Sequence, residues 1–160
     1  MKQTLITEYE QFNNATELEL EDALLLTEAR TNTALSYAPY SNFHVAAVAQ
    51  LDNGQLVYGA NQENASYPVG ICAERTLLSA ISSQYPKQTA VAIAISYLND
   101  NGNSLHPISP CGVCRQTLLE YEQRWGHPIK LILSGQEGKV IVLNSAKDIM
   151  PFSFSSDDMK

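Results

Sequence analysis

The chain contains only three cysteines, and all three lie in two short stretches that could bind a metal ion. Cys72 stands in "GICAERT" (70–76), and Cys111 and Cys114 stand in "SPCGVCRQ" (109–116). Both stretches open predicted helices, where the helix dipole and the free N–H groups favour the thiolate that binds metal. Residues at i and i+3 share one face of a helix, so Cys111 and Cys114 can bind the same ion. The spacing therefore predicts a Zn²⁺ site made of three thiolates.

Three protein ligands leave one position of tetrahedral zinc open, which is typical of catalytic rather than structural sites. The histidines at positions 44, 106 and 127 have no spacing that completes the ligand set, and we interpret them as structural or solvated. The count thus favours one catalytic zinc ion per subunit, with a water on the open position. A C-x-x-C turn alone also fits a redox pair or two buried thiols.

Glu74 follows Cys72 by two residues, at about the third position of its helix. Side chains tilt toward the N-terminus of a helix, so this carboxylate can reach a water at the metal without being a ligand. Glu74 is therefore the candidate general base and then general acid. Arg75 is the candidate that offsets the excess negative charge of three thiolates. In isolation, Glu74 also fits an ordinary acidic residue in the first turn of a helix.

Two helices and five strands must position these residues. Apolar periodicity predicts helices over about 72–84 and 111–125. A Thr16–Glu19 capping box opens a third helix that runs to about Leu35. Strands are predicted at 43–51 and 55–60, which form a hairpin around Asp52-Asn53-Gly54, and at 90–98, 128–135 and 139–145.

Strand–helix–strand connections imply parallel strands covered by helices, whereas the last link is too short for a crossover. The fold class predicted is α/β, a three-layer α/β/α domain with a mixed five-stranded sheet whose last two strands are antiparallel. Residues 1–160 are expected to form a single domain, with 1–15 as an N-terminal arm.

The composition excludes several classes of protein. A net charge of −7 without a basic stripe argues against nucleic acid as a partner. No apolar run is long enough to span a membrane, and the N-terminus lacks the apolar core of a signal peptide. An odd number of cysteines makes a disulfide framework a poor fit. We expect a cytoplasmic protein that acts on a small molecule.

Cys-Ala-Glu followed by Pro-Cys-x-x-Cys resembles the zinc deaminase signature in its all-cysteine form. Beyond this core, "YAPYSNFHV" (37–45), "GANQENASYPVGICAERT" (59–76) and "IMPFSF" (149–154) resemble the small homotetrameric cytidine deaminases. The resemblance covers about residues 20–158.

The resemblance implies a role for each matching residue. Zinc is held by the three cysteines, and Glu74 shuttles protons. The other implied roles concern the nucleoside: Asn61 and Glu63 for the ribose hydroxyls, Phe43 for packing on the pyrimidine, the backbone of Ala73 for the base, and Tyr67 and Phe154 for a neighbouring subunit's site in a homotetramer.

The implied activity is hydrolytic deamination of cytidine and deoxycytidine to uridine and deoxyuridine, with release of ammonia, in pyrimidine salvage. One alternative is a deaminase of a related nucleoside such as blasticidin S. Deaminases of polynucleotides resemble a layout with a helix between strands four and five, for which "SGQEGK" (134–139) leaves no room. A non-catalytic zinc-stabilised or thiol-redox module is the alternative from another class.

Overall fold

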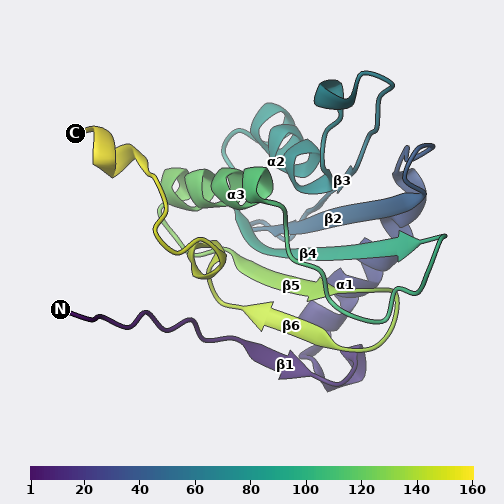
Figure 1. Cartoon of the computed structure of the whole chain (residues 1–160), viewed down its shortest axis with the longest axis horizontal. Helices are drawn as coiled ribbons and strands as arrows, with labels where there is room; N and C mark the ends of the chain where they lie inside the picture. Colours follow the sequence, from purple (N-terminus) through teal and green to yellow (C-terminus); the bar gives the residue numbers. More distant parts are fainter.

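The computed structural model describes residues 1–160 and contains one mixed six-stranded sheet with three α-helices (Figure 1). The strand order across the sheet is β1-β6-β5-β4-β2-β3. The strands are β1 Glu10–Phe12, β2 Phe43–Leu51, β3 Leu56–Ala60, β4 Ala90–Asn99, β5 Lys130–Ser134 and β6 Val140–Leu143. The helices are α1 Leu20–Asn32, α2 Ala73–Gln84 and α3 Gly112–Trp125.

The prediction of five strands is wrong, because the segment expected to be an arm supplies a sixth. β1 pairs antiparallel with β6, with Gln11 opposite Ile141. A strand of three residues is too short to show an alternating pattern, so its pairing partner and not its sequence defines it.

The parallel part of the sheet is smaller than expected. β4 and β5 form the one adjacent parallel pair, and β5 and β6 form the predicted antiparallel hairpin. β2 lies between β3 and β4 and is antiparallel to both. The connection through α2 therefore joins two strands of the same direction, but it passes over β2.

Helices cover both faces of the sheet, as the three-layer prediction requires (Figure 1). On one face α1 packs through Leu25, Leu26 and Ala29. On the other face α2 and α3 pack through an apolar core that includes Leu77, Leu78, Ile81 and Leu118. None of the helices has the length and apolar character needed to cross a membrane.

The predicted capping box at Thr16 is wrong. Asn14 caps a 3₁₀ turn over Ala15–Glu17, because its side chain accepts a hydrogen bond from the Thr16 N–H. α1 begins only at Leu20 and ends at Asn32, followed by a 3₁₀ turn over Thr33–Leu35. Asparagine is as good an N-cap as threonine, so the sequence offered two competing starts.

α2 lies against β3 at a position where only glycine fits. A Cβ on Gly59 would lie 2.4 Å from the Leu77 nitrogen and 2.5 Å from the Ala73 carbonyl oxygen. This close approach fixes the first turns of α2 on the sheet.

Candidate active site

The three cysteines come together from two helix starts. Cys72 is the N-cap of α2 and Cys111 is the N-cap of α3, while Cys114 lies in the first turn of α3 and is fully buried. Their three Sγ atoms all lie within 4.8 Å of one another. The predicted ligand set is therefore a real cluster.

The spacing of the sulfur atoms fits a metal. Cys72 Sγ lies 3.9 Å from Cys111 Sγ, which lies 3.5 Å from Cys114 Sγ. Two thiolates on tetrahedral zinc, with Zn–S bonds of about 2.3 Å, are about 3.8 Å apart. A disulfide would need about 2.05 Å. The donor set and its geometry thus fit Zn²⁺ with one position left for another ligand.

The thiols of the cluster differ in acidity. The hydrogen bond with Cys114 is the main reason that the pKa of Cys72 falls to about 6. The same contact, followed by burial, raises the pKa of Cys114. One thiol of this hydrogen-bonded pair therefore ionises more readily than the other, and a bound metal cation would replace the remaining proton.

Glu74 lies beside the cluster in the first turn of α2 and is 5% exposed. Burial raises the pKa of its carboxyl group, and a hydrogen bond with the Cys114 thiol opposes part of this rise. A carboxyl group with a raised pKa holds a proton more readily than an ordinary glutamate, which suits a group that must both accept and donate protons.

Of the two neighbouring arginines, Arg115 has the clearer structural role. Arg75 acts on Cys72 through its charge, which lowers the pKa of that thiol. The Nε of Arg115 donates to the Pro110 carbonyl at 2.8 Å, and its Nη1 donates to the Ile149 carbonyl at 3.1 Å. Arg115 thereby holds the turn that carries Cys111. Sequence reasoning missed this residue, although its place directly after the C-x-x-C turn was a signal.

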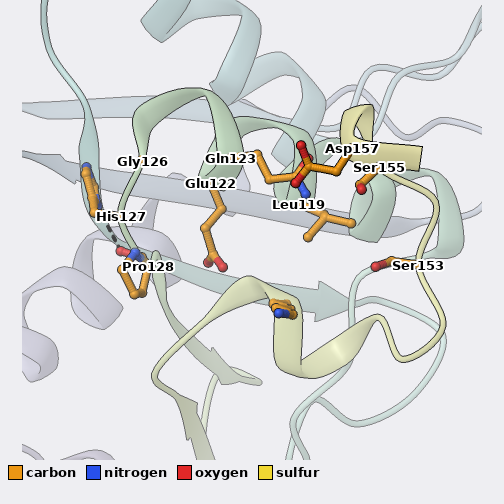
Figure 2. Close-up of a pocket in the computed structure, with 10 residues that line it drawn as sticks. Leu119, Glu122, Gln123, Gly126, His127, Pro128, Ser153, Ser155 and Asp157 are labelled. Carbon is orange, nitrogen blue, oxygen red and sulfur yellow. Dashed lines mark hydrogen bonds between the residues drawn. The ribbon is translucent and has the colours of Figure 1, made fainter. Parts of the chain in front are cut away.

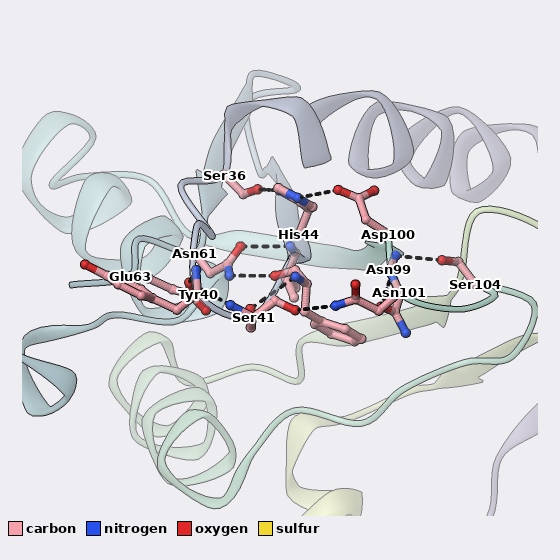
Figure 3. Close-up of polar contacts among 12 residues, drawn as sticks. Ser36, Tyr40, Ser41, His44, Asn61, Glu63, Asn99, Asp100, Asn101 and Ser104 are labelled. Carbon is pink, nitrogen blue, oxygen red and sulfur yellow. Dashed lines mark hydrogen bonds and ion pairs between the residues drawn. The ribbon is translucent and has the colours of Figure 1, made fainter. Parts of the chain in front are cut away.

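Asn61 and Glu63 follow β3 and hold the loop in front of β2 (Figure 3). The Asn61 amide accepts from the Val45 N–H at 2.8 Å and donates to the Phe43 carbonyl at 2.9 Å. One Glu63 carboxylate oxygen accepts from the backbone N–H groups of Tyr40 and Ser41. These contacts leave the second amide hydrogen of Asn61 and further lone pairs of the Glu63 carboxylate for a ligand.

Phe43 opens β2 and stacks on Tyr97 of β4, with ring centroids 4.9 Å apart. Tyr97 is buried, and its hydroxyl has no hydrogen-bond partner. Ala73 is fully buried as the first residue of α2, next to Cys72. No local pattern pointed to Tyr97, because Phe43 is 54 positions away in the chain and β4 has the pattern of an ordinary apolar strand.

The side chains of Tyr67 and Phe154 both lie exposed on the surface. Tyr67 opens a 3₁₀ turn and is 92% exposed, and Phe154 in the C-terminal segment is 60% exposed. The backbone of Phe154 is anchored to α3, since its carbonyl accepts from the Gln116 side chain.

One hollow in the surface lies away from the cysteines (Figure 2). It is bordered by the C-terminal end of α3, at Gly126 and His127, and by Ser153, Ser155 and Asp157 of the C-terminal segment. Cys111 and Cys114 are at the opposite end of α3, so this hollow is separate from the candidate active site.

The family model of the cytidine and deoxycytidylate deaminase zinc-binding region matches residues 20–125. The chain belongs to this deaminase family. The match begins at the first residue of α1 and includes all three cysteines and Glu74, whereas β1 lies outside it. The zinc that the sulfur geometry fits is thus the metal of the family.

Similar proteins extend the match almost to the whole chain. A cytidine deaminase from Halalkalibacterium halodurans is 32% identical over 140 residues, which are 88% of this chain and 98% of that protein. A cytidine deaminase from Mycobacterium tuberculosis is 33% identical over 139 residues, which are 85% of this chain and 91% of that protein.

A crystal structure of cytidine deaminase from Burkholderia pseudomallei has the same fold. It superposes with a TM-score of 0.70 at 34% identity, over 86% of this chain and 100% of that one. The structure of cytidine deaminase from Mycobacterium tuberculosis gives a TM-score of 0.65 at 28% identity. The chain therefore has the deaminase fold with additional residues of its own.

Proposed function

We propose that this protein hydrolyses the exocyclic amine of cytidine and deoxycytidine, and so produces uridine or deoxyuridine and ammonia. The observation that carries the proposal is the cluster of three Sγ atoms within 4.8 Å, with the buried Glu74 in the helical turn that follows Cys72. Membership of the deaminase family supports it.

The cysteines would hold one Zn²⁺ per subunit. When bound, zinc supplies a Lewis acid that makes water a nucleophile at neutral pH. Cys72, Cys111 and Cys114 contribute the thiolates, and the two helix N-termini and Arg75 offset part of their negative charge.

Glu74 would carry the protons of the reaction. Its carboxylate would take one proton from the attacking water and pass it to N3 of the cytosine ring. It would then take the second proton from the resulting C4 hydroxyl and deliver it to the departing amine, so that ammonia leaves and C4 becomes a carbonyl. The raised pKa of this buried carboxyl group supports that role, because a proton shuttle works best with a pKa near the operating pH.

The remaining site residues would hold the nucleoside. Phe43 offers an aromatic ring to the pyrimidine, and the backbone of Ala73 lies next to a metal ligand, where the base must approach. Asn61 and Glu63 keep a free donor and a free acceptor, which suit the two roles of a ribose hydroxyl.

We further propose a homotetramer in which Tyr67 and Phe154 complete a neighbouring subunit's site. Their high exposure is compatible with this role, since aromatic side chains are enriched at interfaces between proteins. In the same proposal, residues 1–160 form one domain, the N-terminal residues are an arm, and the protein works in the cytoplasm, where the three free thiols stay reduced.

The test is the loss of ultraviolet absorbance of cytidine with purified zinc-loaded protein. We expect turnover that a chelator abolishes and added zinc restores. A panel of deoxycytidine, dCMP, cytosine and blasticidin S defines the substrate. Turnover of blasticidin S alone would make the protein a deaminase of a modified nucleoside. Retained zinc without turnover of any compound would show a non-catalytic zinc module.

A further inference from the structure

His44 joins two segments that are distant in the sequence (Figure 3). Its Nδ1 lies within hydrogen-bond distance of the Ser36 Oγ, just after the 3₁₀ turn that ends the α1 segment. Its Nε2 lies 3.1 Å from the Asp100 Oδ2, directly after β4. The imidazole therefore ties both segments to the start of β2.

Both ring nitrogens of His44 can form hydrogen bonds in this bridge. With its proton on Nε2, the ring donates to Asp100 and accepts from the Ser36 hydroxyl, so both nitrogens are satisfied. The residue types are those of a hydrolase triad, but serine meets Nδ1 and aspartate meets Nε2, the reverse of the serine-protease arrangement. Because both ring nitrogens have a partner, the imidazole is held in place at both ends, which fits a positioning role.

The His44 bridge lies next to the residues that would bind the nucleoside. Neighbouring residues of a strand point to opposite faces, so His44 faces the α1 side while Phe43 and Val45 face the other. The backbone groups of Phe43 and Val45 hold the Asn61 amide. Any shift of His44 along or out of β2 moves both groups and thereby turns Asn61.

A second contact supports the same end of β2. The Asp100 N–H donates to the Asn42 carbonyl at 3.1 Å, and Asn42 has a positive φ of 53°. The side chain and the backbone of Asp100 thus both hold the turn into β2, which stabilises a left-handed conformation that asparagine adopts more readily than most residues.

We propose that His44 is a positioning residue for nucleoside binding, which sets Phe43 and Asn61 through its bridge from Ser36 to Asp100. This inference rests on the proposed function. It predicts that breaking the bridge weakens binding of the nucleoside and leaves the metal site and the chemical step intact.

The experiment compares His44→Ala and Asp100→Ala with wild type. We expect the KM for cytidine to rise about five- to tenfold, the scale of one lost hydrogen bond, with kcat and zinc content within twofold. Asp100→Asn keeps an acceptor oxygen and should restore most of the affinity. His127→Ala is the matched control, because His127 bonds to Thr89 and stacks on Trp125 instead.

Binding of uridine, measured by calorimetry, reads the same role without turnover. If wild type fails to deaminate cytidine, the proposed function fails, and a weaker uridine affinity in both alanine variants still supports the bridge. An unchanged KM and uridine affinity would overturn the inference, as would loss of zinc together with kcat. If His44→Ala does not fold, Asp100→Ala decides, since the Asp100 side chain is 53% exposed.

Discussion

At the scale of single residues, the buried Glu74 carries the strongest expectation. Its carboxyl group is only 5% exposed, and this burial disfavours the charged form and so raises its pKa. An ordinary surface glutamate in a first helical turn would show no such shift. A solely structural role therefore does not explain why Glu74 is buried beside the cysteines.

Glu74→Gln should keep the fold and the zinc but lower kcat by about 10²–10⁴, because glutamine has the size of glutamate and cannot shuttle a proton. Cytidine turnover and zinc content by mass spectrometry measure both properties. Glu120→Gln, at an exposed position on α3, is the control. Turnover of Glu74→Gln within tenfold of wild type would remove Glu74 from the mechanism.

Glu63 should contribute stability that depends on pH. Hydrogen bonds, first from the Ser41 side chain, hold the pKa of its carboxyl group below the ordinary 4.5. The folded state therefore binds the proton less readily than the unfolded state, so the contribution is present above pH 4.5 and is lost as the pH falls through the folded value. The Tm difference between wild type and Glu63→Gln should shrink below pH 4.5. A constant difference would contradict this.

The residues predicted from the sequence are those whose chemistry is local. Cys72, Glu74 and the C-x-x-C turn reveal themselves by spacing along a helix. Tyr97 beneath Phe43 and the bridge from His44 to Asp100 depend on strand pairing between distant segments, which a single sequence does not display. Contacts between residues so distant in the sequence could not be predicted from local patterns.

At the scale of elements, the site depends on where two helices begin. β3 leads into α2 and β4 leads into α3, and both strands run in the same direction because β2 lies antiparallel between them. The N-termini of α2 and α3 therefore meet beyond the carboxyl ends of β3 and β4. Ligand sites in α/β folds usually lie at the carboxyl ends of strands. The distance of α2 from the sheet decides whether Cys72 reaches the other two thiols.

Gly59→Ala tests that distance. The added methyl group would lie 2.5 Å from the Ala73 carbonyl, so the start of α2 must move. We expect a loss of about 1–3 kcal/mol of stability together with weaker zinc binding, measured by denaturant titration and chelator competition. Gly112→Ala is the control, because a Cβ there meets no atom within 4 Å. Equal zinc affinity in both variants would contradict the argument.

The boundaries of long elements that end at clear turn residues were predicted to within one or two residues. The Asp52-Asn53-Gly54 turn marks where β2 ends and β3 begins, and the glycine after α3 marks the end of that helix. The start of α1 was not predicted this closely, because Asn14 and Thr16 are both good caps and the apolar residues of α1 continue around the helix, with Leu20 and Leu24 exposed.

At the scale of the whole molecule, β1 lies before residue 20, where the match to the family model begins. It covers β6, whose sequence Val-Ile-Val-Leu would otherwise form an uncovered edge of the sheet. Exposed apolar edge strands invite pairing between molecules. The strand lies at the far end of the sheet from β2 and β3, so its role is separate from catalysis.

Deletion of residues 1–12 should therefore lower the Tm and promote self-association, while kcat and KM stay within twofold of wild type. Deletion of residues 1–8 leaves β1 in place and serves as the control. Light scattering, thermal unfolding and cytidine turnover measure the three properties. A large loss of activity without a change in association would assign the arm to the site instead.

The separation of the metal ligands has a consequence for how the protein matures. Cys72 and Cys111 are 39 positions apart, and the whole of α2 and β4 lies between them. An unfolded chain must close this loop before a third thiol can join the C-x-x-C pair, at a cost in entropy. We therefore expect tight zinc uptake only after β4 has inserted into the sheet. In a newly synthesised chain, zinc binding would then indicate that the central strands of the sheet have folded.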